Sequence, residues 1–198
     1  MTLARIGRSF YERPTPQVAR EVLGKMLVRV VDGRRLSGLI VETEAYRGSR
    51  DPASHAYRGK TRRNAVMFGE VGHAYVYFTM GLHYCLNLTT EGRGTPGAVL
   101  VRAIEPCEGV DEMKKNRGIG VVVGLANGPG KLTEALSINR ELNGEDMVTS
   151  ERLFLEEGKR IRDVGTSPRI GISKGVSRRW RFFVLGNRFV SGAKPRHG

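Results

Sequence analysis

The amino-acid sequence predicts an α+β fold: a single compact domain over residues 1–198, with a largely antiparallel curved sheet and surrounding helices. Three observations support this prediction. Segments with helical patterning are mixed with strands joined as hairpins, which favours α+β over a doubly wound parallel sheet. The 198 residues are enough for one sizeable core. No internal repeat or low-complexity linker divides the chain.

The first predicted element is a helix over residues 15–27. Thr15 suits the N-cap position, because its hydroxyl can accept a hydrogen bond from a free backbone N–H group. Pro16 suits the first helical position, where its missing N–H group costs nothing. The helix would bury a stripe of apolar side chains, Val18, Val22 and Leu23.

Residues 26–31 and 36–46 are predicted to form the two strands of a hairpin. The Asp32-Gly33 pair between them is a turn signal, since both positions of such a turn favour residues that tolerate a positive φ. The following segment, residues 47–72, is rich in Gly, Arg and polar residues and is predicted to be a long loop. Functional residues concentrate on loops that a rigid scaffold holds.

The rest of the chain predicts short strands and one more helix. The strands are expected at residues 74–79, 98–103, 169–172 and 182–185. The helix begins at Gly128-Pro129 and runs to about residue 139, with one apolar face made of Leu132, Ala135 and Leu136. Residues 192–198 form a basic tail that we expect to be loose.

The charge of the chain favours a polyanionic partner. Lys and Arg number 33 against 20 Asp and Glu, which gives a formal net charge of +13. DNA, RNA and an anionic membrane face are all compatible with that balance. No apolar run approaches the ~20 residues of a membrane span, and the first residues lack an apolar signal region, so we expect an intracellular setting.

A carboxylate among aromatic residues is the most specific feature of the sequence. On alternating strands Glu44 and Tyr46 share one face, and Tyr75 and Tyr77 share another. An acid beside aromatic rings suits a pocket that holds a flat ring and activates a water, and on a basic protein that ring would be a nucleobase. The plainer alternatives are that these tyrosines fill the core and that Glu44 is a structural ion-pair partner of Arg102.

Other motif interpretations fail. The segment 128–132 lacks the spacing and the Ser or Thr of a P-loop. The histidines at 55, 73 and 83 have no ligand spacing with Cys85 or Cys107, so no metal site and no cofactor are expected.

Seven short motifs, in order along the chain, resemble those of the alkyladenine (3-methyladenine or methylpurine) DNA glycosylases, and the resemblance extends over nearly the whole sequence. The motifs are residues 41–46 (VETEAY), 61–64 (TRRN), 67–68 (MF), 75–77 (YVY), 101–106 (VRAIEP), 128–132 (GPGKL) and 167–172 (SPRIGI).

The resemblance implies a catalytic group of three residues. Glu44 matches the general base that acts on the hydrolytic water. Arg102 matches an arginine that helps to hold that water, and the backbone carbonyl of Ile170 matches a further acceptor for it.

The resemblance also implies a set of residues that bind the base. Tyr46 and Tyr77 match aromatic rings that stack on it, and His55 matches a third wall that hydrogen-bonds it. Asn87 matches an asparagine that clashes with the 2-amino group of normal guanine. Met80 lies where well-studied members carry an intercalating tyrosine, so this chain departs from the family there, although Met also serves as a wedge in DNA.

The implied function is a monofunctional DNA glycosylase that flips alkylated or deaminated purines out of double-stranded DNA and hydrolyses the N-glycosidic bond. It is expected to act as a monomer at the intracellular genome and to need no cofactor. Two alternatives remain open at this point: a basic nucleic-acid-binding protein without enzymatic activity, with RNA as one candidate partner, and a family member that binds lesions without excising them.

Overall fold

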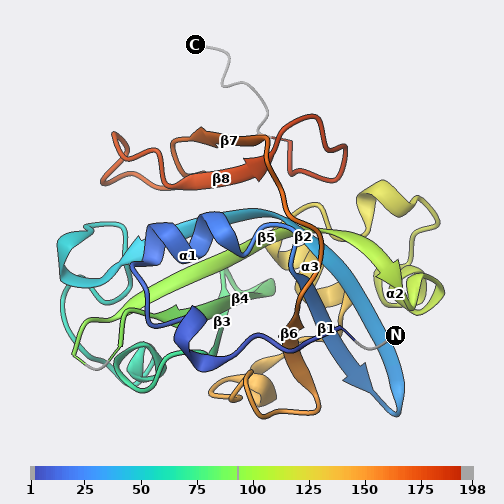
Figure 1. Ribbon diagram of the computed structural model, residues 1–198, viewed down its shortest axis with the longest axis horizontal. Coiled ribbons are helices and arrows are strands. Elements are labelled where there is room, and N and C mark those ends of the chain that lie inside the picture. The colour runs from blue at the N-terminus through green and yellow to red at the C-terminus, as the bar shows by residue number, and fades with distance from the viewer. Residues whose placement is uncertain (1–2, 93, 193–198) are drawn as a thin grey trace.

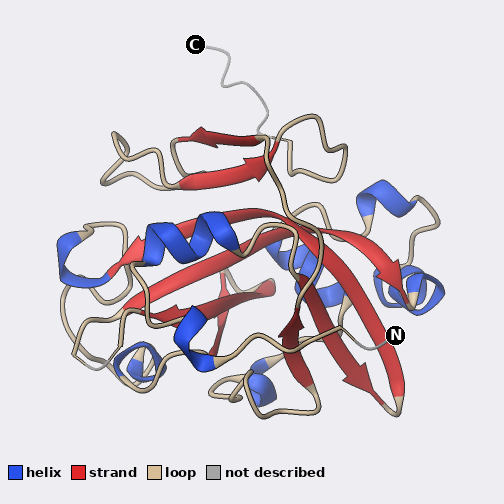
Figure 2. Ribbon diagram, in the orientation of Figure 1, coloured by secondary structure: helices blue, strands red, loops and turns tan. Residues whose placement is uncertain are grey.

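One curled antiparallel sheet organises the molecule (Figures 1 and 2). A computed structural model describes residues 3–92 and 94–192. Within them, eight strands pair in the order β3-β4-β5-β2-β1-β6, and β8 joins β2 and carries β7 beside it. The strands are β1 (Met26–Val31), β2 (Arg34–Arg47), β3 (Ala74–Thr79), β4 (His83–Thr90), β5 (Gly97–Glu108), β6 (Leu153–Glu156), β7 (Val164–Ser167) and β8 (Arg181–Val184).

Helices pack against this sheet and close the core. They are α1 (Thr15–Glu21), α2 (Val110–Arg117) and α3 (Pro129–Ala135). Short 3-10 turns lie at Arg8–Phe10, Gly48–Arg50, Ala65–Phe68, Val122–Gly124 and Arg140–Leu142. The main core cluster joins apolar residues of α1 and α3 to those of the central strands. Helices on one antiparallel sheet in a single compact domain confirm the predicted α+β class. Among the described residues, no helix has the length and apolar character needed to cross a membrane.

The central strand β2 is where the sheet branches. Its first part, residues 34–39, pairs with β1. Its second part pairs with β8, with Glu42 opposite Phe183 and Glu44 opposite Arg181. Along its other edge β2 pairs with β5 from Ser37 to Arg47. Residues 42–44 therefore lie between two neighbouring strands, and their side chains are fully buried.

The predicted helix at 15–27 is present but shorter. It begins at Thr15, with Pro14 as the preceding cap residue, and it ends at Glu21. The chain then turns through Gly24, whose φ of +81° lies in the left-handed region and cannot continue a helix. The residues of the predicted apolar stripe, Val18, Val22 and Leu23, are all buried, but only Val18 is in the helix and the other two lie just past its end.

The hairpin prediction is confirmed. β1 has the predicted bounds, and β2 extends the second strand at both ends. Asp32 and Gly33 have φ values of +49° and +73°, the paired positive angles of a tight hairpin turn. β3 also has its predicted bounds, and β5 continues well beyond the predicted 98–103. α3 buries its predicted face but ends at Ala135, four residues early.

One predicted strand is wrong. Residues 169–172 form a bend, and the strand of this region is β7, just before them. The backbone N–H of Ile170 donates to the Glu44 carboxylate instead of a neighbouring strand, and Gly171 has a φ of +75°. The predicted strand at 182–185 is β8, shifted by one residue. The strands β4 and β6 and the helix α2 were not predicted. The predicted loose tail lies, apart from Gly192, outside the described residues.

Candidate active site

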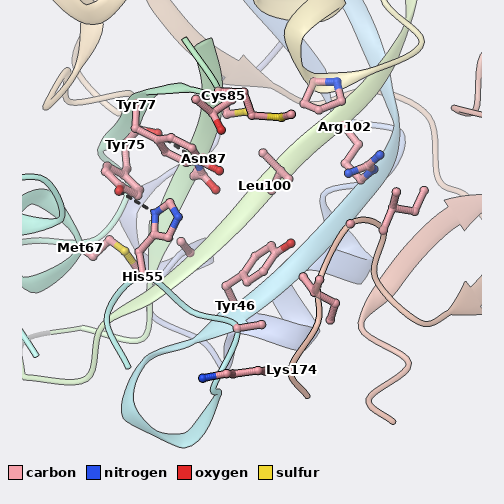
Figure 3. Close-up of a pocket in the computed structure, with 18 of the residues that line it drawn as sticks. Tyr46, His55, Met67, Tyr75, Tyr77, Cys85, Asn87, Leu100, Arg102 and Lys174 are labelled. Carbon is pink, nitrogen blue, oxygen red and sulfur yellow. Dashed lines mark hydrogen bonds between the residues drawn. The ribbon is translucent and has the colours of Figure 1, made fainter. Parts of the chain in front are cut away.

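A cavity of about 470 Å³ opens beside the junction of β2, β4 and β5 (Figure 3). It is lined from several elements that are far apart in the sequence. The lining residues that the sequence singled out are Tyr46, His55, Tyr77, Met80, Asn87, Arg102 and Ile170. Seven of the eight predicted site residues therefore lie around one cavity.

Glu44, the eighth, lies directly behind the cavity wall. Its side chain is fully buried, and its carboxylate contacts three lining residues. Oε2 accepts a hydrogen bond from the Tyr46 hydroxyl at 2.7 Å, and Oε1 accepts one from the Ile170 backbone N–H at 2.7 Å. Nη1 of Arg102 lies 3.5 Å from Oε1. The shared face of Glu44 and Tyr46 is thus confirmed, and a water could reach this carboxylate only past these partners.

The Tyr46 hydroxyl acts as a donor in this arrangement. Burial, together with the charge of Glu44 and the hydrogen bond to it, raises the pKa of Tyr46 well above its ordinary value. The phenol therefore stays protonated at neutral pH, and its proton is directed at the carboxylate. Its ring forms one wall of the cavity, across from His55 (Figure 3).

Arg102 reaches the two acids because β5 contains a bulge. Glu42 is opposite Ala103 and Thr43 is opposite Val101, so Arg102 is an extra residue without a partner on β2. A bulge bends the strand and re-aims a side chain, and bulges are common beside active sites. Burial alone would lower the pKa of Arg102, but the charges of Glu44 and Glu42 outweigh it and raise that pKa. The guanidinium is therefore a fixed cation.

The opposite wall is a cluster of aromatic rings. The ring centroid of His55 lies 4.6 Å from that of Tyr77, and the Tyr75 and Tyr77 centroids are 5.2 Å apart. His55 Nδ1 and the Tyr75 hydroxyl are 2.9 Å apart (Figure 3). Burial, and secondarily the charge of Arg63, lowers the pKa of His55. The imidazole is accordingly neutral at pH 7, and its Nε2 is the atom left to meet a ligand.

The loop that carries His55 is held in place by Asn64. The Asn64 side-chain amide donates to the carbonyls of His55 and Gly59 at 2.8 and 3.0 Å, and its oxygen accepts from the Thr61 N–H at 2.6 Å. The predicted long loop is thus an ordered part of the wall.

Asn87 and Met80 occupy the floor and the mouth of the cavity. Asn87 is 3% exposed on β4, and its Nδ2 donates to the Tyr75 carbonyl at 3.1 Å, which holds the amide in place. Met80 lies on the turn between β3 and β4 with a φ of +53°, and its side chain is 82% exposed. The two are therefore placed for different tasks, one inside the cavity and one at its mouth.

Some residues of the site were not predicted. Cys85 and Leu100 line the cavity and belong to strands on which period-2 alternation alone could have shown them, as it did for Tyr75, which also lines the cavity. Asp51 and Arg169 do not line it, but they support Tyr46 from behind. The Arg169 guanidinium lies 4.6 Å from the centroid of the Tyr46 ring and forms two hydrogen bonds, of 2.5 and 2.8 Å, to the Asp51 carboxylate. No local pattern relates these two residues, because 118 positions separate them.

The cavity offers chemistry based on a carboxylate and aromatic rings. Within residues 3–92 and 94–192, no group of three or more His, Cys, Asp or Glu side chains could hold a metal ion. The arrangement instead combines a carboxylate, a buried guanidinium and backbone groups on one side with a cluster of aromatic rings on the other. Such a site can hold a planar ligand and polarise or deprotonate a water beside it.

Comparison with known proteins identifies the family. A family model described as methylpurine-DNA glycosylase matches residues 9–188. A relative from Chlorobium phaeovibrioides is 48% identical over 196 residues, which cover 98% of this chain and all of the relative. One from Chlorobaculum parvum is 47% identical, over 96% of this chain and 91% of the relative. One from Carboxydothermus hydrogenoformans is 47% identical, over 93% of this chain and 97% of the relative.

All three relatives are provisionally named 3-methyladenine DNA glycosylases. The match over nearly the whole chain confirms the resemblance seen in the seven motifs. The chain therefore belongs to the methylpurine-DNA glycosylase family, the DNA-repair hydrolases that act on N-glycosyl bonds of alkylated purines.

Proposed function

We propose that this protein acts as a monomer on double-stranded DNA, flips a damaged purine into the cavity of Figure 3 and hydrolyses its N-glycosidic bond with a water. The observation that carries the proposal is the position of Glu44 directly behind Arg102 and Ile170, which line one wall of a cavity whose opposite wall is made of aromatic rings. Alkylated purines fit this cavity best, because a cationic flat base stacks well on electron-rich rings. Deaminated purines would enter in the same way.

Binding begins with the positive surface. The net charge of +13 attracts the phosphate backbone without reading sequence. Met80 then enters the base stack, and the damaged nucleotide rotates between Tyr46 on one side and Tyr77 with His55 on the other. Asn87 on the floor excludes normal guanine by contact with its 2-amino group.

The chemical step uses one water and no covalent intermediate. The hydrogen bond from the Tyr46 hydroxyl to Oε2 of Glu44 breaks, and a water takes the place of the hydroxyl, beside Arg102 and the Ile170 backbone. The bond between C1′ and the purine nitrogen breaks, and its electron pair leaves with the base. The water oxygen bonds to C1′ while Glu44 takes the water's proton. A cationic methylpurine leaves as a neutral base, so it needs no further proton.

The assay that tests the activity measures free purine. Duplex DNA carrying alkylated purines is incubated with the protein, and released bases are separated and quantified. Free alkylated purine with an abasic, uncut strand is expected. Lys174 lines the rim of the cavity, so borohydride trapping is included. A trapped covalent adduct would contradict the monofunctional assignment, and lesion binding without release would favour a non-catalytic family member.

Met80→Ala is expected to weaken binding to lesion-containing duplex by about tenfold to a hundredfold, because burying a Met side chain is worth about 1.5–3 kcal/mol. Base release from single-stranded substrate, which needs no wedge, should change little. Titration of labelled duplexes measures the first quantity, and single-turnover release measures the second. Leu82→Ala is the matched control, since Leu82 is on the same hairpin and 76% exposed but does not line the cavity. Equal losses of duplex affinity in both variants would contradict a specific wedge role for Met80.

Asn87→Ala is expected to raise the release of normal guanine relative to alkylated adenine by about tenfold, because the side chain that excludes the 2-amino group is gone. Competition between the two bases in one duplex gives this ratio directly. Thr89→Ala serves as the control: Thr89 is buried on the same strand and does not line the cavity. An unchanged ratio in Asn87→Ala would show that guanine is excluded by another part of the wall.

A further inference from the structure

A second carboxylate lies on β2, two residues before Glu44, and the chemistry described above does not use it. Glu42 is fully buried. Its Oε1 accepts hydrogen bonds from Arg102 Nε at 2.9 Å, Arg181 Nε at 2.7 Å and the Ser191 hydroxyl at 2.8 Å. Its Oε2 accepts from the Ser191 backbone N–H at 2.6 Å. Four donors from three parts of the chain therefore hold one carboxylate.

Glu42 and Glu44 share one guanidinium. Both acids lie on the same face of β2, and the bulged residue Arg102 reaches both. Its Nε donates to Glu42, while its Nη1 stays 3.5 Å from Glu44. The closer contact is thus made to the carboxylate that is remote from the cavity. Arg102 also lines the cavity wall, so its guanidinium remains available on that side.

Glu42 is itself held rigidly. Arg181 donates to the Ser167 hydroxyl at 3.1 Å and to the Ser191 carbonyl at 3.2 Å, in addition to Glu42. Its guanidinium carbon lies 4.6 Å from the centroid of the Phe183 ring. A charged group that is buried with this many partners has no alternative position of similar energy. The end of the described chain therefore fixes the back of the site.

The charges of this cluster balance. Glu42 and Glu44 carry two negative charges, and Arg102 and Arg181 carry two positive ones. Without the charge of Glu42, one cation is in excess, and the nearest remaining carboxylate for Arg102 is Glu44. A closed Arg102–Glu44 ion pair would bind the guanidinium to the carboxylate, so that neither group would be free to hold the water.

We propose that Glu42 is a positioning residue for the hydrolytic reaction: it holds Arg102 back from Glu44, so that the carboxylate can accept a water and the guanidinium can help to hold it. This inference rests on the proposed function, which assigns the water to Glu44 and Arg102. It adds a residue that touches neither the base nor the water. The role is to keep an ion pair from closing.

The test compares three isosteric variants. Glu42→Gln removes the charge with little change in size. Glu156→Gln is the matched control, because Glu156 is also buried, bonds Arg35 at 2.6 Å and is on β6, away from the cavity. Glu44→Gln reports on the base itself. For each, single-turnover release of an alkylated purine, affinity for lesion duplex and thermal unfolding are measured, with rates taken well below every unfolding midpoint.

Glu42→Gln is expected to slow release about 10- to 100-fold, since a displacement of about 1 Å at a reacting group can cost that much. Its affinity for lesion duplex should stay within about twofold of wild type, whereas Glu156→Gln should lose stability without losing rate. If Glu42→Gln does not fold, Ser191→Ala removes one of the four hydrogen bonds, and a loss of about threefold in release with unchanged affinity is expected.

Three outcomes decide the matter. If Glu44→Gln is inactive and Glu42→Gln keeps the wild-type rate, the positioning role is overturned while the proposed function stands. A wild-type rate in Ser191→Ala overturns the role in the same way where Glu42→Gln is not folded. If Glu44→Gln releases base normally, the proposed use of Glu44 fails first, and the inference fails with it.

Discussion

Glu44→Gln is expected to release free alkylated purine about 10²- to 10⁴-fold more slowly than the wild-type protein, the usual contribution of a general base. Glutamine keeps the size of the side chain: its carbonyl oxygen can accept from the Ile170 N–H group, and its NH2 group can donate to the Tyr46 hydroxyl, which rotates to accept. It cannot take a proton from the water, and it carries no charge to stabilise a sugar cation. Single-turnover release from duplex DNA measures the effect.

The variant should keep its fold and its hold on DNA. Glu44 has no exposed surface, so neither the electrostatic attraction to phosphate nor the Met80 wedge depends on it. Binding to duplex with an abasic site, together with the thermal midpoint, is the appropriate control. Normal release by a folded Glu44→Gln would show that another group activates the water. Lost binding together with lost release would instead indicate a damaged structure.

The sequence predicted the parts of the fold that local patterns specify. The hairpin of β1 and β2 was predicted because its turn residues favour a positive φ, and β3 because its apolar run has clear ends. The helix boundaries were wrong by several residues, since apolar periodicity continues past Glu21 into residues buried without being helical. The bend at 169–172 was read as a strand because it contains apolar residues, but the backbone N–H of Ile170 bonds Glu44 and not a neighbouring strand.

The membership of the site was predicted from the motifs, but its geometry was not. The motifs named the residues around the cavity, and the alternation along β2 placed Glu44 and Tyr46 on one face. That Glu44 lies behind the wall, and that Arg102 is a bulged residue shared with Glu42, depends on strand register between distant segments. The plainer interpretation of Glu44 as an ion-pair partner of Arg102 is half true, because the contact exists at 3.5 Å.

The support of Tyr46 is the least predictable part of the site and the most sensitive to mutation. Arg169 and Asp51 are fully buried and pair with each other, and Arg169 also donates to the Ala45 carbonyl at 2.8 Å. Arg169 lies one residue before Ile170, so this pair anchors both the Tyr46 ring and the backbone that contacts Glu44. A cation behind a ring that must receive a cationic base would be unfavourable if Asp51 did not neutralise it.

Asp51→Asn is therefore expected to destabilise the protein by about 3–5 kcal/mol, the usual cost of leaving one member of a buried ion pair without its partner. For a chain of this size, a loss of that order lowers the thermal midpoint by roughly 10 °C. Calorimetry or a dye-based melt measures it. Glu21→Gln is the matched control: it breaks the Arg13–Glu21 pair, whose side chains are 31% and 44% exposed, and should cost about 0–1 kcal/mol.

The same pair predicts how stability depends on pH. Burial alone would raise the pKa of Asp51, but the hydrogen bonds and charge of Arg169 outweigh it and hold the pKa below its usual value. A carboxyl with a depressed pKa in the folded state stabilises fully above its unfolded value, about 3.9, and loses that contribution as pH falls through the folded value. The stability difference between wild type and Asp51→Asn should thus be constant near neutrality and shrink below about pH 4. A difference that stayed constant into strong acid would mean that the ionised Asp51 is not what stabilises Arg169.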